Sequence, residues 1–505
     1  MKVCIRCLSP GSIPSFLHKR TCIRGVSCVT QSYIYQSRRW FGQPAAQTHP
    51  HLIKEGEVTP GITKEEYRNR RHLLSSLALQ TEKSRNHIML VPSATKQFMS
   101  QKIPYPFHQN TDFLYLCGFM EPDSLLVMQC NNSESANTTL FVPKRNIEEE
   151  KWDGPRSGIE GTIQLTGVDK AFNNTEIEGY LSKYLCDNSD FVLWYNEKAI
   201  VNRSLQEGVL KNFVREDKHY KNENVITALQ ALKVLKSPTE IEIMRKSCAI
   251  ASESFIEVMK YSYPGVNEHY LYAKMDYECR IRDAEILAYP PVVAGGNRAN
   301  TIHYINNNKI IEDGDLVLMD AGCEYHGYCS DITRTWPVSG KFTDEQRCIY
   351  DIVLRIQKKC LECCVPGQTM NQIYVYMLDL MGKELQKIGI IPQNCSNLVE
   401  AAKPFCPHHV SHYLGMDLHD TDHVTTNQQL QPDRYYNRRK LQHNQVITIE
   451  PGIYLPEDSY NIPSEFRGMG IRIEDNVLIT SSKPEVLSSG APKEPEEIEM
   501  IMARS

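Results

Sequence analysis

The chain contains 505 residues, carries a net charge of −5, and is 41% hydrophobic and 23% charged. At about 100–200 residues per domain this length predicts two or three domains, and the composition is that of an ordinary globular protein rather than a coiled coil or a disordered chain. No apolar run approaches the roughly 20 residues that a membrane-spanning helix needs, which argues against an integral membrane protein.

The charge is distributed unevenly along the chain. Residues 1–54 contain eight Lys or Arg and no Asp or Glu, which leaves −13 on the other 451 residues. An acidic body argues against nucleic acid as the main partner. A basic, acid-free start that lacks a compact apolar stretch is typical of a mitochondrial transit peptide rather than a secretory signal. We expect residues 1–54 to direct the protein to the mitochondrion; a disordered basic arm and an additional cytoplasmic form are the alternatives.

The segment 60–222 predicts an α/β domain. Thr63 followed by Glu66 fits a capping box, so a helix is expected to begin there. Helical or loop segments then separate five strand-like runs. A charged stretch at 211–223 is interpreted as the linker to the next domain. The predicted strands are His87–Val91, Phe113–Leu116, Ser124–Gln129, Thr138–Val142 and Phe191–Tyr195.

The segment 228–505 predicts one plan that is used twice: two helices followed by strands. Ser237 and Thr343 each begin a capping box, and each first helix stops before a Pro-Gly pair. The two Pro-Gly pairs lie 102 residues apart, at 264 and 366. We expect a helix that begins at Ser237 and stops before Pro264, further helices at about 268–284, 343–364 and 370–387, and a pseudo-symmetric domain that closes around one site. The Pro/Glu-rich tail from Ser481 is expected to be loose until its end.

Two apolar segments bring carboxylates toward one another. Leu316–Asp320 is a strand that ends in an acid, and Asp331 begins the next strand. If these strands form a hairpin that turns at Tyr325-His326, Asp320 lies directly opposite Asp331. Neighbouring carboxylates repel unless a cation joins them, so the pair predicts a metal site, although ordinary turn or edge acids would give the same pattern.

Further acids and histidines strengthen the metal interpretation. Glu450 ends another apolar strand, and Arg472 and Glu474 share one face of a third. Four histidines lie between residues 408 and 419. One imidazole with four carboxylates suits Mn²⁺ or a similar divalent ion, and five ligands suit two ions that activate a water molecule. The pattern predicts metal-assisted hydrolysis.

The ordered set Asp320, Asp331, His412, Glu450 and Glu474 resembles the ligands of the pita-bread metallopeptidases, the family of methionine aminopeptidase, prolidase and aminopeptidase P. Val410–Asp420, Gly470–Asn476 and Pro104–Gly118 are most similar to aminopeptidase P. The resemblance implies an α/β (α+β) chain, with an aminopeptidase P N-terminal domain at 60–222 and a pseudo-symmetric pita-bread catalytic domain at 228–505.

The same resemblance implies the role of each residue. Asp320 would bind one metal ion, Asp331 and Glu474 would bridge two ions, and His412 and Glu450 would bind the second. Glu450 would also act as general base. The residues that would contact or orient the substrate are His303, His408, His419, Tyr289 and Arg472.

The implied activity is hydrolysis of the bond between an N-terminal residue and a following proline, with two Mn²⁺ ions per chain. Peptide N-termini with proline in second position would be the partners, and the chain would form a homodimer. A prolidase-like dipeptidase and a pita-bread interaction scaffold are the rival hypotheses. An intact ligand set argues against the scaffold.

Overall fold

The computed structural model describes residues 41–82, 85–131, 136–197, 201–214, 220–421 and 439–503, and Phe41–Ser505 form one compact unit. Most of the predicted transit peptide lies outside the described residues. Residues 41–54 belong to the folded unit: Phe41 and Ala45 are buried in a core cluster, and Gln43 Nε2 donates to the Gly118 carbonyl at 2.9 Å. The acid-free composition therefore ends at residue 54, but the folded unit already begins at Phe41. None of the helices described is both long and apolar enough to cross a bilayer.

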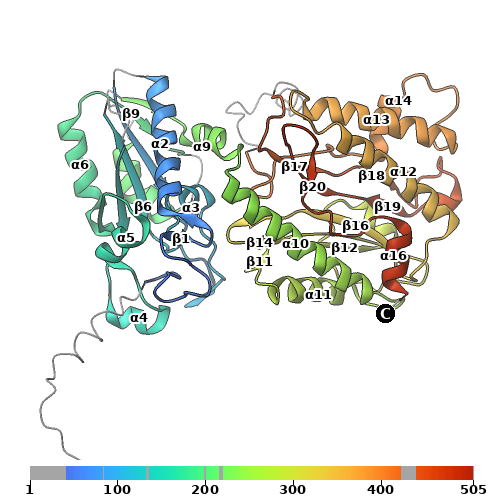
Figure 1. The fold of residues 1–505 in the computed structure, drawn as a ribbon, viewed down its shortest axis with the longest axis horizontal. Helices are drawn as coiled ribbons and strands as arrows, with labels where there is room; N and C mark the ends of the chain where they lie inside the picture. The colour runs from blue at the N-terminus through green and yellow to red at the C-terminus, as the bar shows by residue number, and fades with distance from the viewer. Residues whose placement is uncertain are drawn as a thin grey trace, which may run out of the picture. The chain divides into compact units, whose positions relative to one another are not determined.

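A six-stranded mixed sheet forms the centre of the N-terminal half, with strand order β10-β9-β3-β6-β7-β8. Its central strand β3 (Asn86–Pro92) pairs antiparallel with β6 (Leu125–Cys130) and parallel with β9 (Phe191–Trp194). Alternate β3 residues enter two different core clusters, because side chains on a strand point to opposite faces. Helices α2 (Lys64–Thr81) and α6 (Ile177–Asp187) contribute to these two clusters, so both faces of the sheet are covered (Figure 1).

The remaining elements of this half are short. They are β1 (Glu57–Thr59), β2 (Ile62–Thr63), β4 (Phe98–Ser100), β5 (Ile103–Pro104), α3 (Thr111–Cys117), β7 (Asn137–Val142), α4 (Ile147–Asp153), α5 (Gly158–Thr166), β8 (Lys170–Asn173), α7 (Arg203–Leu205), α8 (Lys211–Phe213), β10 (Tyr220–Glu223) and α9 (Val225–Lys233).

Two predictions for this half are wrong. Residues 113–116 form part of helix α3 rather than a strand, because Asn110 caps the helix by accepting from Phe113 N and Gly118 ends it in the left-handed conformation. A run of four apolar residues cannot by itself distinguish the two structures. The charged stretch 211–223 is also not simply a linker, since its last four residues form the edge strand β10, parallel to β9.

The second half contains the predicted repeated plan. Helices α10 (Pro238–Lys260) and α11 (Glu268–Arg280) are followed by strands β12 (Val292–Gly295), β13 (Leu316–Ala321) and β16 (Ile332–Pro337). Helices α12 (Asp344–Glu362) and α13 (Met370–Lys387) are followed by β17 (Val446–Ile449), β20 (Asp475–Leu478) and β21 (Glu485–Val486). Ser237 and Thr343 both make the predicted capping boxes. The two sheets are joined at a bridge between Thr333 and Glu474.

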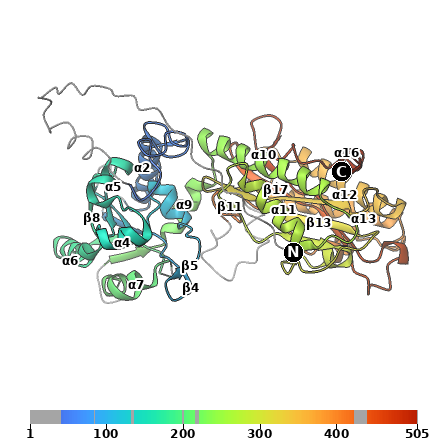
Figure 2. The same ribbon diagram turned by 90° about the horizontal axis from the view of Figure 1, so that it is seen from below.

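Helices form the outside of this half and strands its inside (Figures 1 and 2). Helix α10 packs on β16, and α12 packs on β17 and on the hairpin of β18 (Gly452–Leu455) and β19 (Met469–Arg472). A smaller sheet consists of β11 (Ile286–Leu287), β14 (Cys323–Tyr325) and β15 (Tyr328–Cys329). Helix α14 (Leu398–Ala402) follows α13. The strand ends of both repeats meet in the middle.

The C-terminal tail is not loose, contrary to the prediction. Ser488 Oγ donates to Asp475 at 2.7 Å, Lys493 Nζ lies 2.5 Å from the same carboxylate, and helix α16 spans Pro495–Met502. The buried Arg334–Asp475 ion pair explains this order, because Arg334 also donates to the carbonyls of Ala491 and Pro492. Buried charges need such partners, and the tail supplies them.

Candidate metal centre

The five predicted ligands come from five different segments that meet where the two repeats join. Asp320 lies on β13 and Asp331 directly precedes β16, while Glu450 directly follows β17 and Glu474 directly precedes β20. His412 lies in the irregular segment after α14, which is fixed to β17 by a bridge between Tyr413 and Ile447. Residues up to 154 positions apart in sequence are thus brought to one buried place.

The hairpin that carries Asp320 and Asp331 differs from the predicted one by one turn residue. The turn is at His326-Gly327, both with positive φ, and not at Tyr325-His326. The partner of Asp320 is consequently Thr333, and the prediction that Asp331 lies directly opposite Asp320 is wrong. Two-residue turns of this kind favour glycine, which the prediction did not weigh.

Tyr289 links the two acids although they are not cross-strand partners. The Tyr289 hydroxyl lies 2.6 Å from Asp320 Oδ1 and 2.7 Å from Asp331 Oδ1. Gly322 has the close approach that places Asp331 here, since a Cβ at that position would lie 1.7 Å from the Ser330 carbonyl oxygen. The two carboxylates are therefore neighbours through a shared hydrogen-bonding partner.

The other ligands complete a continuous cluster. The ligand atoms of Asp331, His412 and Glu474 all lie within 4.8 Å of one another. His412 Nε2 is 3.2 Å from Asp331 Oδ2 and 3.8 Å from Glu450 Oε1. The structure thus brings together all five residues that the sequence singled out, as four carboxylates and one imidazole.

Hydrogen bonds orient these side chains. His412 Nδ1 donates to the Tyr413 carbonyl at 3.0 Å, which leaves Nε2 directed at the carboxylates. Arg472 is buried. Its Nη2 donates to Asp320 at 2.5 Å and its Nε donates to Thr333 Oγ1 at 2.9 Å. Thr333 in turn donates to Glu474 Oε2 at 2.7 Å. Outer partners of this kind fix the geometry of metal ligands.

The electrostatics of the cluster favour a cation. Burial and the neighbouring carboxylates raise the pKa of Glu450 to about 7 and hold the pKa of Glu474 well above its usual range. Burial opposes the charge on His412, yet its hydrogen bond to Asp331 and the charge of Glu450 raise its pKa to about 10. The pKa of Asp320 is also raised by burial, whereas the hydrogen bond to His412 lowers the pKa of Asp331. The carboxyls with raised pKa values favour protons that a divalent ion would displace.

The remaining predicted residues surround this cluster. His408 Nε2 accepts from the Tyr454 hydroxyl at 2.9 Å, and burial together with the charge of Arg472 lowers the pKa of His408 to about 3, so its ring is neutral. The ring of His419 packs edge-on against His412, with centroids 4.5 Å apart. His303 is exposed but near enough to His408 to lower its pKa.

Sequence reasoning missed two residues of the site, Tyr454 and Thr333. Tyr454 links His408 to Arg472 Nη1, which lies 2.7 Å from its hydroxyl. For Tyr454, the available signal was its position four residues after Glu450, on the next strand, β18. His409, adjacent to His408, stacks on Tyr374 instead and does not face the carboxylates.

The comparisons with known proteins agree with this geometry. The profile of metallopeptidase family M24 matches residues 242–481, and that of the aminopeptidase P N-terminal domain matches residues 67–194. Xaa-Pro aminopeptidase 3 of Rattus norvegicus is 44% identical over 98% of this chain and 99% of its own length. The chain belongs to metallopeptidase family M24.

Relatives from other organisms and solved structures extend this result. The mitochondrial intermediate cleaving peptidase 55 of Arabidopsis thaliana is 37% identical, over 93% of this chain and 89% of its own length. Zinc-substituted aminopeptidase P of Escherichia coli superposes with a TM-score of 0.77 at 33% identity, covering 88% of this chain and 99% of that one. The predicted fold class, an aminopeptidase P N-terminal domain followed by a pita-bread catalytic domain, is confirmed.

Family membership makes the chain a metal-dependent aminopeptidase, and neither the dipeptidase nor the scaffold hypothesis is favoured. Divalent metal ions are the cofactors of such an enzyme. The donor set fits them: carboxylate oxygens and one imidazole nitrogen, buried together with an excess of negative charge, suit a divalent ion of moderate hardness.

Proposed function

We propose that this enzyme releases the N-terminal residue of a peptide when proline follows it. The observation that carries the proposal is the convergence of four carboxylates and one imidazole beside a neutral His408, in a chain that is 44% identical to a relative named Xaa-Pro aminopeptidase 3. The aminopeptidase P N-terminal domain supports the same choice.

The proposed centre holds two divalent ions, with Mn²⁺ as the physiological metal. Asp320 would hold one ion, His412 and Glu450 would hold the other, and Asp331 and Glu474 would contribute to both. When bound, the ions supply an activated water molecule and polarise the carbonyl that precedes proline. Carboxylate ligands suit Mn²⁺, whereas metal ions such as Cu⁺ and Zn²⁺ are selected by softer thiolate ligands.

The chain's own groups orient and protonate the substrate. Glu450 lies between the rings of His408 and His412, with oxygens 3.6 and 3.8 Å from their nitrogens, and is placed to take a proton from the attacking water and deliver it to the leaving nitrogen. His419 donates to the carbonyl oxygen, and His303 and His408 line the path of the peptide. Arg472 and Tyr289 orient the carboxylates by hydrogen bonding, and Tyr289 links Asp320 to Asp331.

Two further proposals concern the protein in the cell. The basic segment 1–54 acts as a mitochondrial transit peptide, which the mitochondrial name of the Arabidopsis relative supports; removal of residues before Phe41 would leave the folded unit intact. The domain limits are 60–222 and 228–505. Fusion of residues 1–54 to a reporter tests the targeting, and a reporter that stays in the cytosol contradicts it.

We also propose that the chain forms a homodimer. The hairpin of β4 and β5 exposes Phe98, Met99, Ile103 and Tyr105, each by about half of its surface. Clusters of exposed apolar side chains commonly mark protein interfaces. Light scattering of the wild type and of the double variant Phe98→Ser/Ile103→Ser tests this: a wild-type monomer contradicts the proposal.

The specificity is tested with three substrates and residues 41–505 of the chain. The protein is stripped of metal, reloaded with Mn²⁺ and offered an Xaa-Pro dipeptide, an Xaa-Pro-Xaa tripeptide and an Xaa-Ala-Xaa control. Release of the first residue from the proline tripeptide, dependent on Mn²⁺, is the expected result. Cleavage of the dipeptide alone would indicate a prolidase, and equal cleavage of the alanine control would refute the proline specificity.

A further inference from the structure

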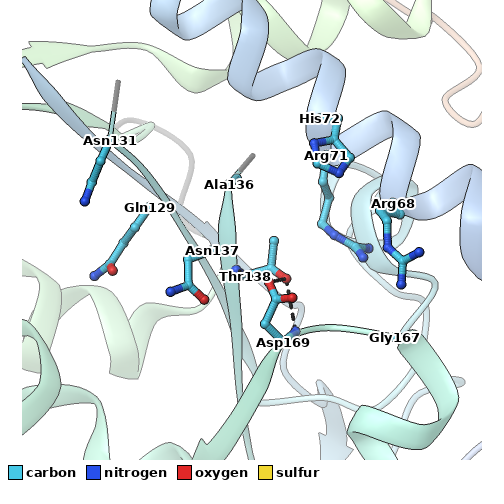
Figure 3. A pocket seen from close by; sticks show the side chains of 10 residues that line it. All are labelled: Arg68, Arg71, His72, Gln129, Asn131, Ala136, Asn137, Thr138, Gly167 and Asp169. Carbon is cyan, nitrogen blue, oxygen red and sulfur yellow. Dashed lines mark hydrogen bonds between the residues drawn. The ribbon is translucent and has the colours of Figure 1, made fainter. Parts of the chain in front are cut away.

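The N-terminal domain contains a polar cavity that lies far in sequence from the metal centre. Its volume is about 430 Å³, within the range of about 300–1,000 Å³ for small-molecule sites. Three basic residues of α2 form one wall, and the ends of β6 and β7 and the turn before β8 form the other (Figure 3). We call it the α2 pocket; its lining is Arg68, Arg71, His72, Gln129, Asn131, Ala136, Asn137, Thr138, Gly167 and Asp169.

The basic wall has a buried arginine that forms no ion pair with a carboxylate of the described residues. Arg71 is 2% exposed, and its Nη1 donates to the Leu116 carbonyl at 2.9 Å, while its Nε has no hydrogen-bonding partner among the described residues. Burial lowers the pKa of Arg71, and the attraction of Cys117 and Asp169 offsets this only in part. A buried cation in this state is costly unless an anion joins it.

The neighbouring Arg70 shows what neutralisation looks like in the same helix. Its Nη2 lies 2.9 Å from Glu66 and 3.7 Å from Glu240, and it also donates to the Tyr115 carbonyl. Among the described residues Arg71 has no carboxylate at ion-pair distance. The two arginines are adjacent, buried and similar in backbone contacts, so the missing acid is specific to the one that lines the α2 pocket.

The one carboxylate of the α2 pocket is already engaged. Asp169 Oδ2 accepts from both Thr138 N and Thr138 Oγ1 at 2.7 Å. Figure 3 shows Arg68 and Arg71 reaching from α2 toward the side where Thr138 and Asp169 lie. Two guanidinium groups therefore face one occupied carboxylate, and the cavity keeps a positive excess.

The opposite wall offers hydrogen bonds without charge. Gln129 and Asn137 are direct cross-strand partners on β6 and β7. Their side-chain amides, and that of Asn131, have no partner within the part of the chain that the structure describes. Among the residues that the structure describes, Arg68 is held only by a surface pair with Glu65, with side chains 51% and 63% exposed. Such pairs are weak enough to yield to a ligand.

We propose that the α2 pocket binds a sugar phosphate. Arg68, Arg71 and His72 would hold the phosphate group, because guanidinium groups bind phosphate oxygens in pairs and three donor groups match its three free oxygens. The amides of Gln129, Asn131 and Asn137 would hold the sugar hydroxyls. The proposal concerns a separate site and does not depend on the peptidase specificity.

Calorimetric titration of the metal-loaded full chain tests the proposal. The probes are ribose 5-phosphate and glucose 6-phosphate, each with its unphosphorylated sugar, and inorganic phosphate. The decisive variant is Asn137→Asp, which places a negative charge against the two arginines at an exposed position; Arg68→Gln is the second. Arg71→Met is not decisive, since loss of the bond to Leu116 would also loosen α3. Arg203→Gln is the matched control, because Arg203 is 72% exposed, pairs with Glu207 and lies outside the α2 pocket.

The expected result is binding of at least one sugar phosphate, no binding of the free sugars, and affinity weaker by about tenfold or more in both pocket variants but not in Arg203→Gln. Unchanged hydrolysis by the variants would confirm that they fold. No binding of either sugar phosphate, or binding that Asn137→Asp leaves intact, overturns the proposal; the latter would place the ligand outside the α2 pocket. Equal affinity for inorganic phosphate overturns the role of the sugar.

Discussion

Two clusters of carboxylates among the described residues differ in how many cations they contain: the metal centre of the catalytic half, and a cluster that joins Asp112 of α3 to residues of the catalytic half. At the metal centre, four acids face the single guanidinium of Arg472 and the ring of His412. The second cluster, here called the lysine clamp, consists of Asp112, Asp417, Asp420, Lys233 and Lys236.

The lysine clamp is neutralised by the protein itself. Lys233 Nζ lies 2.7 Å from Asp417 and 3.2 Å from Asp112, and Lys236 Nζ lies 2.9 Å from Asp420, with lysine side chains only 4% and 1% exposed. Although burial raises it, the pKa of Asp417 is held below its usual value by Lys233. With three acids for two lysines, burial still raises the pKa of Asp112. The metal centre has a larger deficit of cations, and this deficit makes it a ligand set rather than a structural link.

The largest effect is expected from Glu450→Gln, which removes the proposed general base and the negative charge of one metal-binding carboxylate. The kcat for the proline tripeptide should fall by at least about 100-fold, since a positioned general base contributes about 10²–10⁴. The fold should persist, because a buried acid with a raised pKa is replaced by a neutral amide. Steady-state kinetics and circular dichroism measure both; a variant with more than a tenth of wild-type kcat refutes the assigned role.

The lysine clamp should respond in stability instead. Lys236→Met leaves Asp420 buried without its close ammonium group, and breaking a buried pair costs about 3–5 kcal/mol. Urea unfolding measures the loss. Lys358→Met, which breaks the half-exposed pair with Glu494, is the matched control and should cost no more than about 1 kcal/mol. Equal losses in the two variants would mean that the clamp is not structural.

Metal removal should distinguish the two clusters directly. Ions that bind the folded state alone stabilise it by about 2.7 kcal/mol at 100 times Kd, so chelation should lower the Tm of the wild type. Glu474→Gln should lose most of this Mn²⁺-dependent shift, whereas Lys236→Met should retain it at its lower Tm. A wild-type Tm that does not respond to Mn²⁺ would contradict a metal site at these residues.

The smallest effect is expected at His108, which lies beside the clamp and is paired with Glu324 at 2.8 Å. The hydrogen bond to Glu324 raises the pKa of His108 above its usual 6.5. Because the folded-state pKa is the higher one, the pair stabilises the protein fully below about pH 6.5, and the contribution is lost as pH rises through the folded pKa. The stability difference between wild type and His108→Gln, measured by urea unfolding from pH 5.5 to 9, should shrink with pH. A difference that stays constant would show that the imidazole charge is not involved.

Much of the local structure and the ligand chemistry of the metal centre could be predicted from sequence patterns. Ser237 and Thr343 could be predicted as helix N-caps because a capping box depends on residues only three positions apart. The alternation along β3 follows from the two-residue period of a strand. The five ligands could be named because carboxylates at the ends of apolar strands are costly without a partner, and their order matches a known family.

The turn at His326-Gly327, which sets the residue that faces Asp320, and the caps Asn110 and Gly118, which make α3 a helix, are local signals that the apolar pattern outweighed. Other features depend on residues far apart in the chain and are fixed by tertiary packing. The tail is ordered by Arg334 and Asp475, far from it in sequence. The lysine clamp and Tyr454 carried no periodic signal. The physical reason is the same in each case: a buried charge or hydroxyl is satisfied by whichever group the fold brings near, and sequence spacing does not encode that proximity.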